Sequence, residues 1–450
     1  MNSKVNLLKG SLFKNIFMFS LPLILSNLLQ VFFTMADSSI VGLFSGPKAL
    51  GSVGSASTLV MLFTGLLMGM GSGVNVLVAK YIGQNNKNRL NQMVHTGFII
   101  SLIFGILVMI AGILIVRPLL EILNTKVELM DGSVRYLSIY LCGMPGLALY
   151  NYGNGVYSAM GETKKPVIFL SLAGALNIAL NFLFVVGLDM SVAGVAIASI
   201  CAHYTAASLL MISLFNSKEI CKLKLSDLKV NKSLAVELLK VGIPSGIQYA
   251  LFSVSNLFIQ SAVNTFDATI VEGNAAAANA DHLIYDVMSA FYVACASFMS
   301  QNYGANNRKR VLNSYLVSLI YSFGLGLILS ISLYIFGREF LSLFTNDINV
   351  IDAGMRRIKV LCFAYSLSAF MDCAIAASRG LGRTLVPTAL VFLGSGLFRI
   401  VWIFTVFKYY GTFESLFMLY FFSYTITGLL ETLYFIYSYR KVFKKHEINS

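Results

Sequence analysis

Residues 80–87 read KYIGQNNK, and residues 301–308, 221 positions later, read QNYGANNR. Pro22 and Pro244 keep almost the same spacing, at 222 positions. Landmarks that recur at nearly one interval over most of a chain indicate a duplicated unit. Both copies of the quoted stretch lie between long apolar segments, and duplicated bundles of membrane helices are how many secondary transporters are built.

The composition favours a membrane protein. Hydrophobic residues make up 57% of the chain and charged residues 12%, with a mean hydropathy of +0.76. A soluble domain carries about 25% charged residues. Uncharged runs such as 97–116 match the roughly 20 residues that cross a hydrocarbon core of about 30 Å. No water is available in the hydrocarbon core, so the backbone N–H and C=O groups must form hydrogen bonds with one another. The short alternating segments of a β-barrel are absent. The sequence therefore predicts an all-α polytopic membrane protein.

Apolar runs between charged residues or Gly, Pro and Asn breaks predict twelve transmembrane helices in two homologous groups of six. The spans of the first group are 15–43, 53–79, 92–116, 133–160, 166–187 and 192–215. Those of the second group are 235–265, 273–300, 312–336, 354–378, 386–408 and 414–438. The predicted organisation is an N-terminal lobe over 1–215, a polar linker over 216–233, a C-terminal lobe over 234–438 and a basic tail over 439–450.

The distribution of Lys and Arg predicts the orientation. The termini and the even-numbered loops carry 22 of these residues, and the odd-numbered loops carry nine. By the positive-inside rule, both termini, the linker and the tail are cytoplasmic. The net charge of +13 is therefore mainly a topology signal. Because the basic residues are scattered over loops, we expect no nucleic-acid partner.

Three polar residues stand out in the first lobe, because an ionisable group at membrane depth usually faces a cavity, a partner or an ion path. Asp37 lies in the outer half of the first span; the alternative is an interfacial residue at a helix end. Asn177 and Asn181 are four residues apart and share one face of the fifth span. Their amides suit a partly dehydrated cation, and the alternative is hydrogen bonding between helices.

The second lobe carries charged residues within its predicted spans. Asp372 lies in the middle of the tenth span, and Asn151 occupies the matching position of the first repeat. Asp281 and Asp286 fall on adjoining faces of the eighth span. Arg399 is the only arginine that the predicted boundaries place deep in a helix. It needs a counter-charge, which Asp372, Asp281 or Asp286 could supply, so a neutral structural pair is the alternative to a functional role.

Other signals are architectural. Gly65, Gly69 and Gly73 recur every four residues and predict close packing of the second span on a neighbouring helix. Glu431 lies nearer the cytoplasmic end of the last span and is expected to be structural. No P-loop, zinc-protease, nucleophile-elbow or paired-cysteine metal motif occurs. We therefore expect no enzymatic activity and no cofactor other than a coupling ion, Na⁺ or H⁺, bound by buried carboxylates.

The motifs together resemble the multidrug and toxic compound extrusion (MATE) family. ADS at 36–38, ALG at 49–51 and AKYIG at 79–83 are similar to its first two helices. NIALN at 177–181 and AGVAIA at 193–198 are similar to its fifth and sixth helices, and QNYGA at 301–305 and RGLGRTLVP at 379–387 to its second lobe. The resemblance covers essentially the whole chain.

The resemblance implies a monomeric antiporter of the bacterial inner membrane, surrounded by lipid, whose two six-helix lobes form a V-shaped central cavity. Such proteins export varied small molecules, often cationic, in exchange for Na⁺ or H⁺. The family's cation site falls on Asp37, Asn177 and Asn181, where some members carry Asp at the last position. The acidic position of its tenth helix matches Asp372. Another branch has a glutamate in the seventh helix, and this chain offers only amides there.

Two rival functions are open. A lipid-linked oligosaccharide flippase would have a related architecture of fourteen helices, but only twelve spans are predicted and no cluster of arginines is available for a pyrophosphate. A membrane enzyme or a non-transporting sensor is the second rival. Enzymes of that kind usually carry clustered His or Asp motifs at the membrane surface, and the sequence has none.

Overall fold

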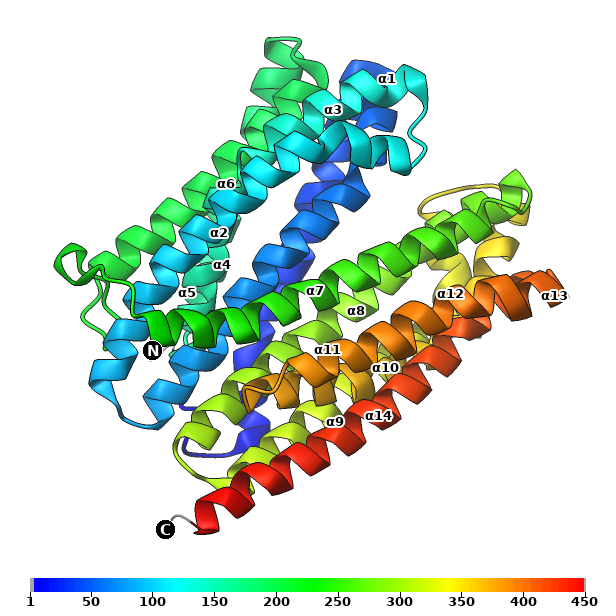
Figure 1. The fold of residues 1–450 in the computed structure, drawn as a ribbon. Coiled ribbons are helices and arrows are strands. Elements are labelled where there is room, and N and C mark those ends of the chain that lie inside the picture. Colours follow the sequence, from blue (N-terminus) through cyan, green and yellow to red (C-terminus); the bar gives the residue numbers. More distant parts are fainter. Residues whose placement is uncertain (1–3, 449–450) are drawn as a thin grey trace. The chain divides into compact units, whose positions relative to one another are not determined.

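The computed structural model describes residues 4–448, and over this part of the chain it is built of helices without strands (Figure 1). The elements of the first half are α1 (Leu12–Gly83), α2 (Lys87–Ile122), α3 (Val127–Leu141), α4 (Met144–Ala159), α5 (Lys164–Asn181), η1 (Phe182–Gly187) and α6 (Ser191–Phe215). A short turn, η2 (Leu225–Asp227), follows in the linker. The elements of the second half are α7 (Lys232–Val263), α8 (Ala268–Gly304), α9 (Arg308–Ser342), α10 (Ile348–Gly380), α11 (Leu385–Val391), η3 (Phe392–Leu397), α12 (Phe398–Trp402), η4 (Ile403–Phe407), α13 (Lys408–Tyr410) and α14 (Phe413–Ile448).

The predicted spans coincide with these helices. The first two spans form the 72-residue α1, which is interrupted at Gly46, where φ is 83°. The fourth span consists of α3 and α4, and the eleventh runs continuously from α11 to α13 through two π-helical segments. Nine helices of the described residues are long and apolar enough to cross a membrane, α1 counting once. The all-α membrane fold class is confirmed.

The duplicated sequence folds into duplicated local structure. Asn85 after α1 and Asn306 after α8 both adopt the left-handed conformation, with φ of 52° and 54°. Asparagine tolerates this conformation better than other residues with a side chain. The next residue of each copy caps the following helix: Asn86 accepts from the backbone N–H of Arg89, and Asn307 does the same in α9.

The chain divides into two compact units whose boundaries differ from those of the predicted lobes. Unit 1 comprises the chain up to Asn6 and Leu25–Ala250, and unit 2 comprises Leu7–Ile24 and Leu251 onward. The first part of α1 and the residues that precede it thus pack within unit 2. Asn302 Nδ2 donates to Leu7 O, just before α1, at 3.0 Å. The first part of α7 packs within unit 1, where Lys80 forms an ion pair with Glu237 at 2.7 Å.

Within unit 1, the glycines of α1 pack against the first part of α7. A Cβ at Gly69 would lie 2.1 Å from the backbone N of Gly246, and one at Gly73 would lie 3.1 Å from Gly242. The prediction that this glycine repeat lets the second span approach a neighbour is confirmed. The neighbour is a helix from the second half of the sequence.

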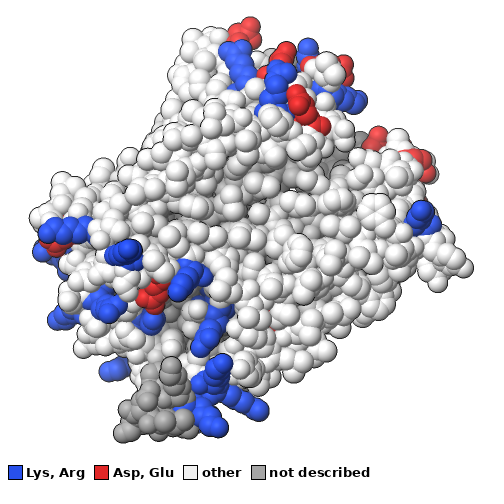
Figure 2. Space-filling model, in the orientation of Figure 1, with Lys and Arg blue, Asp and Glu red and all other residues white. Residues whose placement is uncertain are grey.

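Within unit 2, α10 is the central helix, since it packs against α8, α9 and α14. Its apolar window is 78% buried, the largest share among the candidate membrane spans. Charged side chains gather toward the helix ends on the face in Figure 2, which leaves the middle of the helices uncharged. This pattern is the one expected of helices that cross a membrane.

Candidate functional site

In unit 1, three helices bring four polar side chains together. Asp37 comes from α1, Asn177 and Asn181 from α5, and Ser199 from α6. Asn181 Nδ2 donates to Asp37 Oδ1 and, at 3.3 Å, to Asn177 Oδ1. Ser199 Oγ donates to Asp37 Oδ2 at 3.3 Å. The structure thus joins the three residues that the sequence singled out in this lobe, and it adds Ser199.

The donor set of this cluster suits a proton or a small hard cation. Both oxygens of Asp37 accept from neutral donors, which favours the ionised carboxylate. Asn181 Oδ1 is buried, and no hydrogen-bond partner for it occurs among the described residues. Carboxylate and amide oxygens are the ligands of hard cations. The residues present therefore fit Na⁺ through Asp37, Asn177 and Asn181, and they fit H⁺ through Asp37.

The surroundings of the cluster are aromatic. Tyr136 and Tyr140 stack on each other with ring centroids 5.9 Å apart. Both phenols interact electrostatically with Asp37. The Tyr140 hydroxyl pairs with His203 at 3.2 Å. The π-helical segment η1 begins directly after Asn181. Such segments are frequent at functional sites, and η4 starts 221 positions later in the other repeat.

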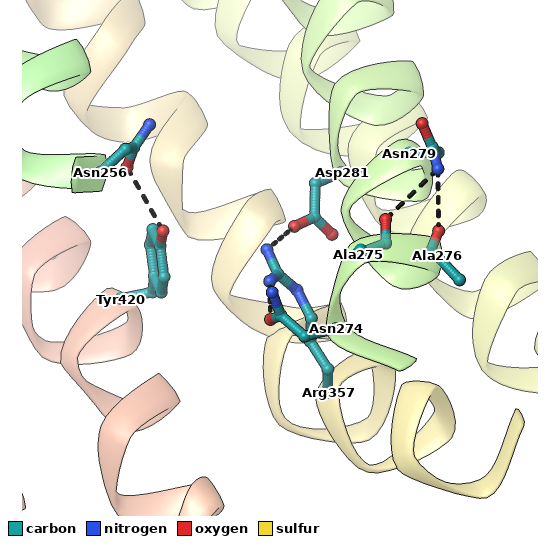
Figure 3. A network of polar contacts seen from close by, with 8 residues as sticks. All are labelled: Asn256, Asn274, Ala275, Ala276, Asn279, Asp281, Arg357 and Tyr420. Atoms are coloured by element: carbon teal, nitrogen blue, oxygen red, sulfur yellow. Dashed lines mark hydrogen bonds and ion pairs between the residues drawn. The ribbon is translucent and has the colours of Figure 1, made fainter. Parts of the chain in front are cut away.

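In unit 2, a buried arginine organises a polar network (Figure 3). Arg357 on α10 is 7% exposed, and its guanidinium bonds to Asp281 and Asn274, both on α8. The same guanidinium lies 4.7 Å from the ring centroid of Phe417 on α14. Arg357 was missed by sequence reasoning, because it lies at the edge of the tenth span and was counted with the loop charges.

Arg399, whose counter-charge the sequence left open, lies among aromatic rings. It is 1% exposed, and no carboxylate lies within ion-pair distance of it in the part of the chain that the structure describes. Its guanidinium instead lies 4.6 Å and 5.1 Å from the ring centroids of Tyr420 and Tyr424, and its Nε donates to Ser423. Aromatic faces thus stabilise this cation in place of a direct ion pair, and a role of Arg399 in ion coupling or substrate binding stays a prediction.

Asp372 on α10 is almost wholly buried, as its mid-span position predicts. The charges of Arg379 and Arg399 act on it. Glu431 on α14 is completely buried, although the sequence indicated only a structural residue near a helix end.

Asn151 donates to Leu147 O within its own helix. Asp286 is partly buried on α8. The roles of Asn151 and Asp286 as ligands stay predictions.

Comparison with known proteins decides the family. The MatE family model matches the chain twice, over residues 22–183 and over residues 244–405. The chain belongs to the MatE family. The two matches start 222 residues apart, which confirms the duplication that the sequence indicated. Members of this family are transporters with several membrane-spanning helices, so the prediction of a transporter rather than an enzyme is confirmed.

The MatE chain has relatives over most of its length. It is 25% identical over 389 residues to "Probable multidrug resistance protein YoeA" of Bacillus subtilis, covering 85% of this chain and 84% of that protein. It is 24% identical over 410 residues to "Probable multidrug resistance protein NorM" of Thermotoga maritima, covering 88% and 86%. A solved transporter of the MOP superfamily from Pyrococcus furiosus has the same fold, with a TM-score of 0.90 at 21% identity over 97% and 98% of the two chains.

Proposed function

We propose that this MatE protein is a secondary active exporter of varied organic compounds, often cationic, that it exchanges for Na⁺ or H⁺. The names of its relatives support multidrug efflux. The observation that carries ion coupling is the cluster of Asp37, Asn177, Asn181 and Ser199, which joins three helices through one carboxylate. In this proposal the protein lies in a bacterial plasma membrane with both termini cytoplasmic.

The charge state of Asp37 would control how α1 packs on α5 and α6. The ionised carboxylate accepts from Asn181 and Ser199 and so holds the three helices together. Protonation removes the negative charge and one acceptor site, which weakens these bonds. A cation would instead draw the amide oxygens toward the carboxylate. Either ion thus favours one arrangement of the helices, and a substrate that prefers the other arrangement is exchanged for it.

Asp372 would supply the corresponding titratable group of unit 2. It is buried in the central helix of that unit, and two arginines act on its charge. A group whose charge is costly at membrane depth is suited to bind and release an ion during a transport cycle. In this proposal the two carboxylates act in alternating access, one in each repeat.

Efflux of a fluorescent cation in inverted membrane vesicles tests the role of Asp37. We expect Asp37→Asn to abolish ion-driven transport, because the amide neither titrates nor attracts a cation. Asp131→Asn is the matched control, since the Asp131 side chain is 92% exposed and lies outside the cluster. Unchanged ion-driven transport by Asp37→Asn would remove Asp37 from the proposal.

A gradient swap distinguishes the coupling ions. Purified protein in liposomes is given either a pH jump at constant sodium or a sodium jump at constant pH. The gradient that drives substrate exchange identifies the ion. Exchange driven by neither gradient, with substrate still bound, would contradict antiport altogether.

A further inference from the structure

Glu431 is an unusual group in unit 2. Its side chain on α14 is 0% exposed, and neither of its carboxylate oxygens has a hydrogen-bond partner among the described residues. Burying an ionised carboxylate without partners costs many kcal/mol, so such a group takes up a proton instead. The proposed function makes no use of this residue.

The helix packing places Glu431 beside Asp372. A Cβ at Gly428 of α14 would lie 3.2 Å from the backbone N of Met371, so α14 touches α10 at the residue before Asp372. Glu431 follows Gly428 by three residues and therefore lies on the same face of α14, about one turn further along. The charge of Asp372 acts on Glu431. Asp372 Oδ2 is itself buried and without a hydrogen-bond partner in the described part of the chain.

We infer that Glu431 and Asp372 form a carboxyl pair that binds one proton inside unit 2, and that Glu431 carries this proton in the present conformation. The inference deepens the proposed function, since it names a proton site for the second repeat. When the proton moves, the O–H bond of Glu431 breaks and an O–H bond to Asp372 forms. One carboxylate and one carboxylic acid are present before and after the transfer.

The groups around the pair explain why it holds one proton rather than none or two. Arg379 acts on both carboxyl groups, and Arg399 acts on Asp372. These cations favour an ionised Asp372, whose negative charge then disfavours a second anion at Glu431. Other titratable side chains on which the charge of Asp372 acts are neutral phenols and a thiol, namely Tyr292 on α8, Cys373 on α10 and Tyr424 on α14.

A pair of two ionised carboxylates balanced by two arginines is the competing arrangement. It requires the carboxylates to accept hydrogen bonds from those arginines, because a buried ion pair needs good geometry to offset desolvation. The bare oxygens of Glu431 do not meet this requirement. A protonated acid that is left without an acceptor costs far less than an anion in the same place.

Infrared spectroscopy of the purified full-length protein tests the inference without any transport step. At pH 7, exposed glutamates with a pKa of about 4.3 are ionised, so the carbonyl stretch of a carboxylic acid reports only buried protonated groups. We expect such a band in the wild type, a downward shift of the band when glutamate alone carries ¹³C in its carboxyl group, and loss of the band in Glu431→Gln. Glu339→Gln, at an exposed position of α9, should keep the band.

Asp372→Asn provides a second test that does not depend on the folding of the Glu431 variant. Removing the neighbouring anion favours ionised Glu431, so the glutamate band should disappear at a lower pH in this variant than in the wild type. A wild-type spectrum without a protonated glutamate band would overturn the inference. If Asp37→Asn loses transport but keeps the glutamate band, both the proposed role of Asp37 and the inference about Glu431 are supported. If Asp37→Asn keeps both transport and the band, only the proposed role of Asp37 is removed.

Discussion

Gly69 of α1 and Gly246 of α7 meet backbone to backbone within unit 1. A Cβ on Gly69 would lie 2.1 Å from the Gly246 N and 2.3 Å from its Cα, distances that atoms cannot adopt. Glycine at both positions is what allows the two helices to approach so closely. The packing of unit 1 depends on this contact, because it joins a helix of the first repeat to one of the second.

We therefore expect Gly69→Ala to destabilise the protein by at least the roughly 1–3 kcal/mol that overpacking costs. The obstruction is backbone, which cannot rotate away as a side chain would. Thermal unfolding in detergent, followed by intrinsic fluorescence, measures the effect. Gly54→Ala in the same helix is the control, since a Cβ there meets nothing within 4 Å. Equal midpoints for the two variants would contradict the contact.

Cys221 provides a pH-dependent prediction in the linker between the two halves of the sequence. Its side chain is 1% exposed, and burial raises the pKa of its thiol to about 12. Since only the thiolate is nucleophilic, Cys221 should react with a hydrophilic maleimide at pH 8 only after the protein has been unfolded by a denaturing detergent. Because the pKa is raised in the folded state, the protonated Cys221 thiol contributes fully to the free energy of unfolding below the ordinary thiol pKa of about 8.5. This contribution of Cys221 is lost as the pH rises toward 12.

The experiment uses a variant in which Cys221 is the only cysteine. The control is Lys218→Cys in a protein without other cysteines, because position 218 is exposed in the same linker. We expect the control to be labelled within minutes in the folded state. Comparable labelling of Cys221 would show that the linker does not enclose it.

Much of this architecture could be predicted from the sequence because its signals are local. Hydropathy and the Gly, Pro and Asn breaks mark the helices, and the repeated Asn pair marks the same cap in both copies. The cluster of Asp37, Asn177 and Asn181 could also be predicted, because polar groups at membrane depth are rare and the two amides lie one turn apart.

The exchange of segments between the units could not be predicted. Residues 7–24 and the first part of α7 are both apolar, and nothing in their composition shows which copy of the repeat they pack against. Ser199 was missed because small hydroxyl residues are common in membrane helices. Glu431 was assigned by its distance from the helix end, which does not reveal that neighbouring helices cover it completely.

The aromatic environment of Arg399 predicts that lysine cannot replace it. The planar guanidinium stacks on Tyr420 and Tyr424 while its Nε bonds to Ser423. A lysine ammonium is a strongly hydrated point charge that cannot stack in this way. We expect Arg399→Lys to lose about 1–2 kcal/mol of stability from the cation–π contacts. The midpoint of thermal unfolding measures this loss of stability. Lys408→Arg, the opposite exchange at an exposed helix end, is the control. An unchanged midpoint in Arg399→Lys would contradict the stabilising role of the rings.

Arg357 and Asp281 allow the sharpest comparison, because the chain also contains exposed ion pairs. Arg117–Asp131 and Arg338–Asp352 occupy equivalent positions of the two repeats and are largely exposed. Exposed pairs contribute about 0–1 kcal/mol. Asp281→Ala, in contrast, leaves the buried Arg357 charge without its carboxylate, which costs about 3–5 kcal/mol.

A double-mutant cycle separates the pair from the rest of the network. Asp281→Leu combined with Arg357→Met should recover most of the stability that either single change loses, because no unpaired charge is left buried. The same cycle at Asp131 and Arg117 should show almost no coupling. Thermal unfolding of the wild type, the four single variants and the two double variants gives both coupling energies. If the two were equal, the Arg357–Asp281 pair would have to be hydrated in the protein, and the buried network of unit 2 would not be held together by its charge.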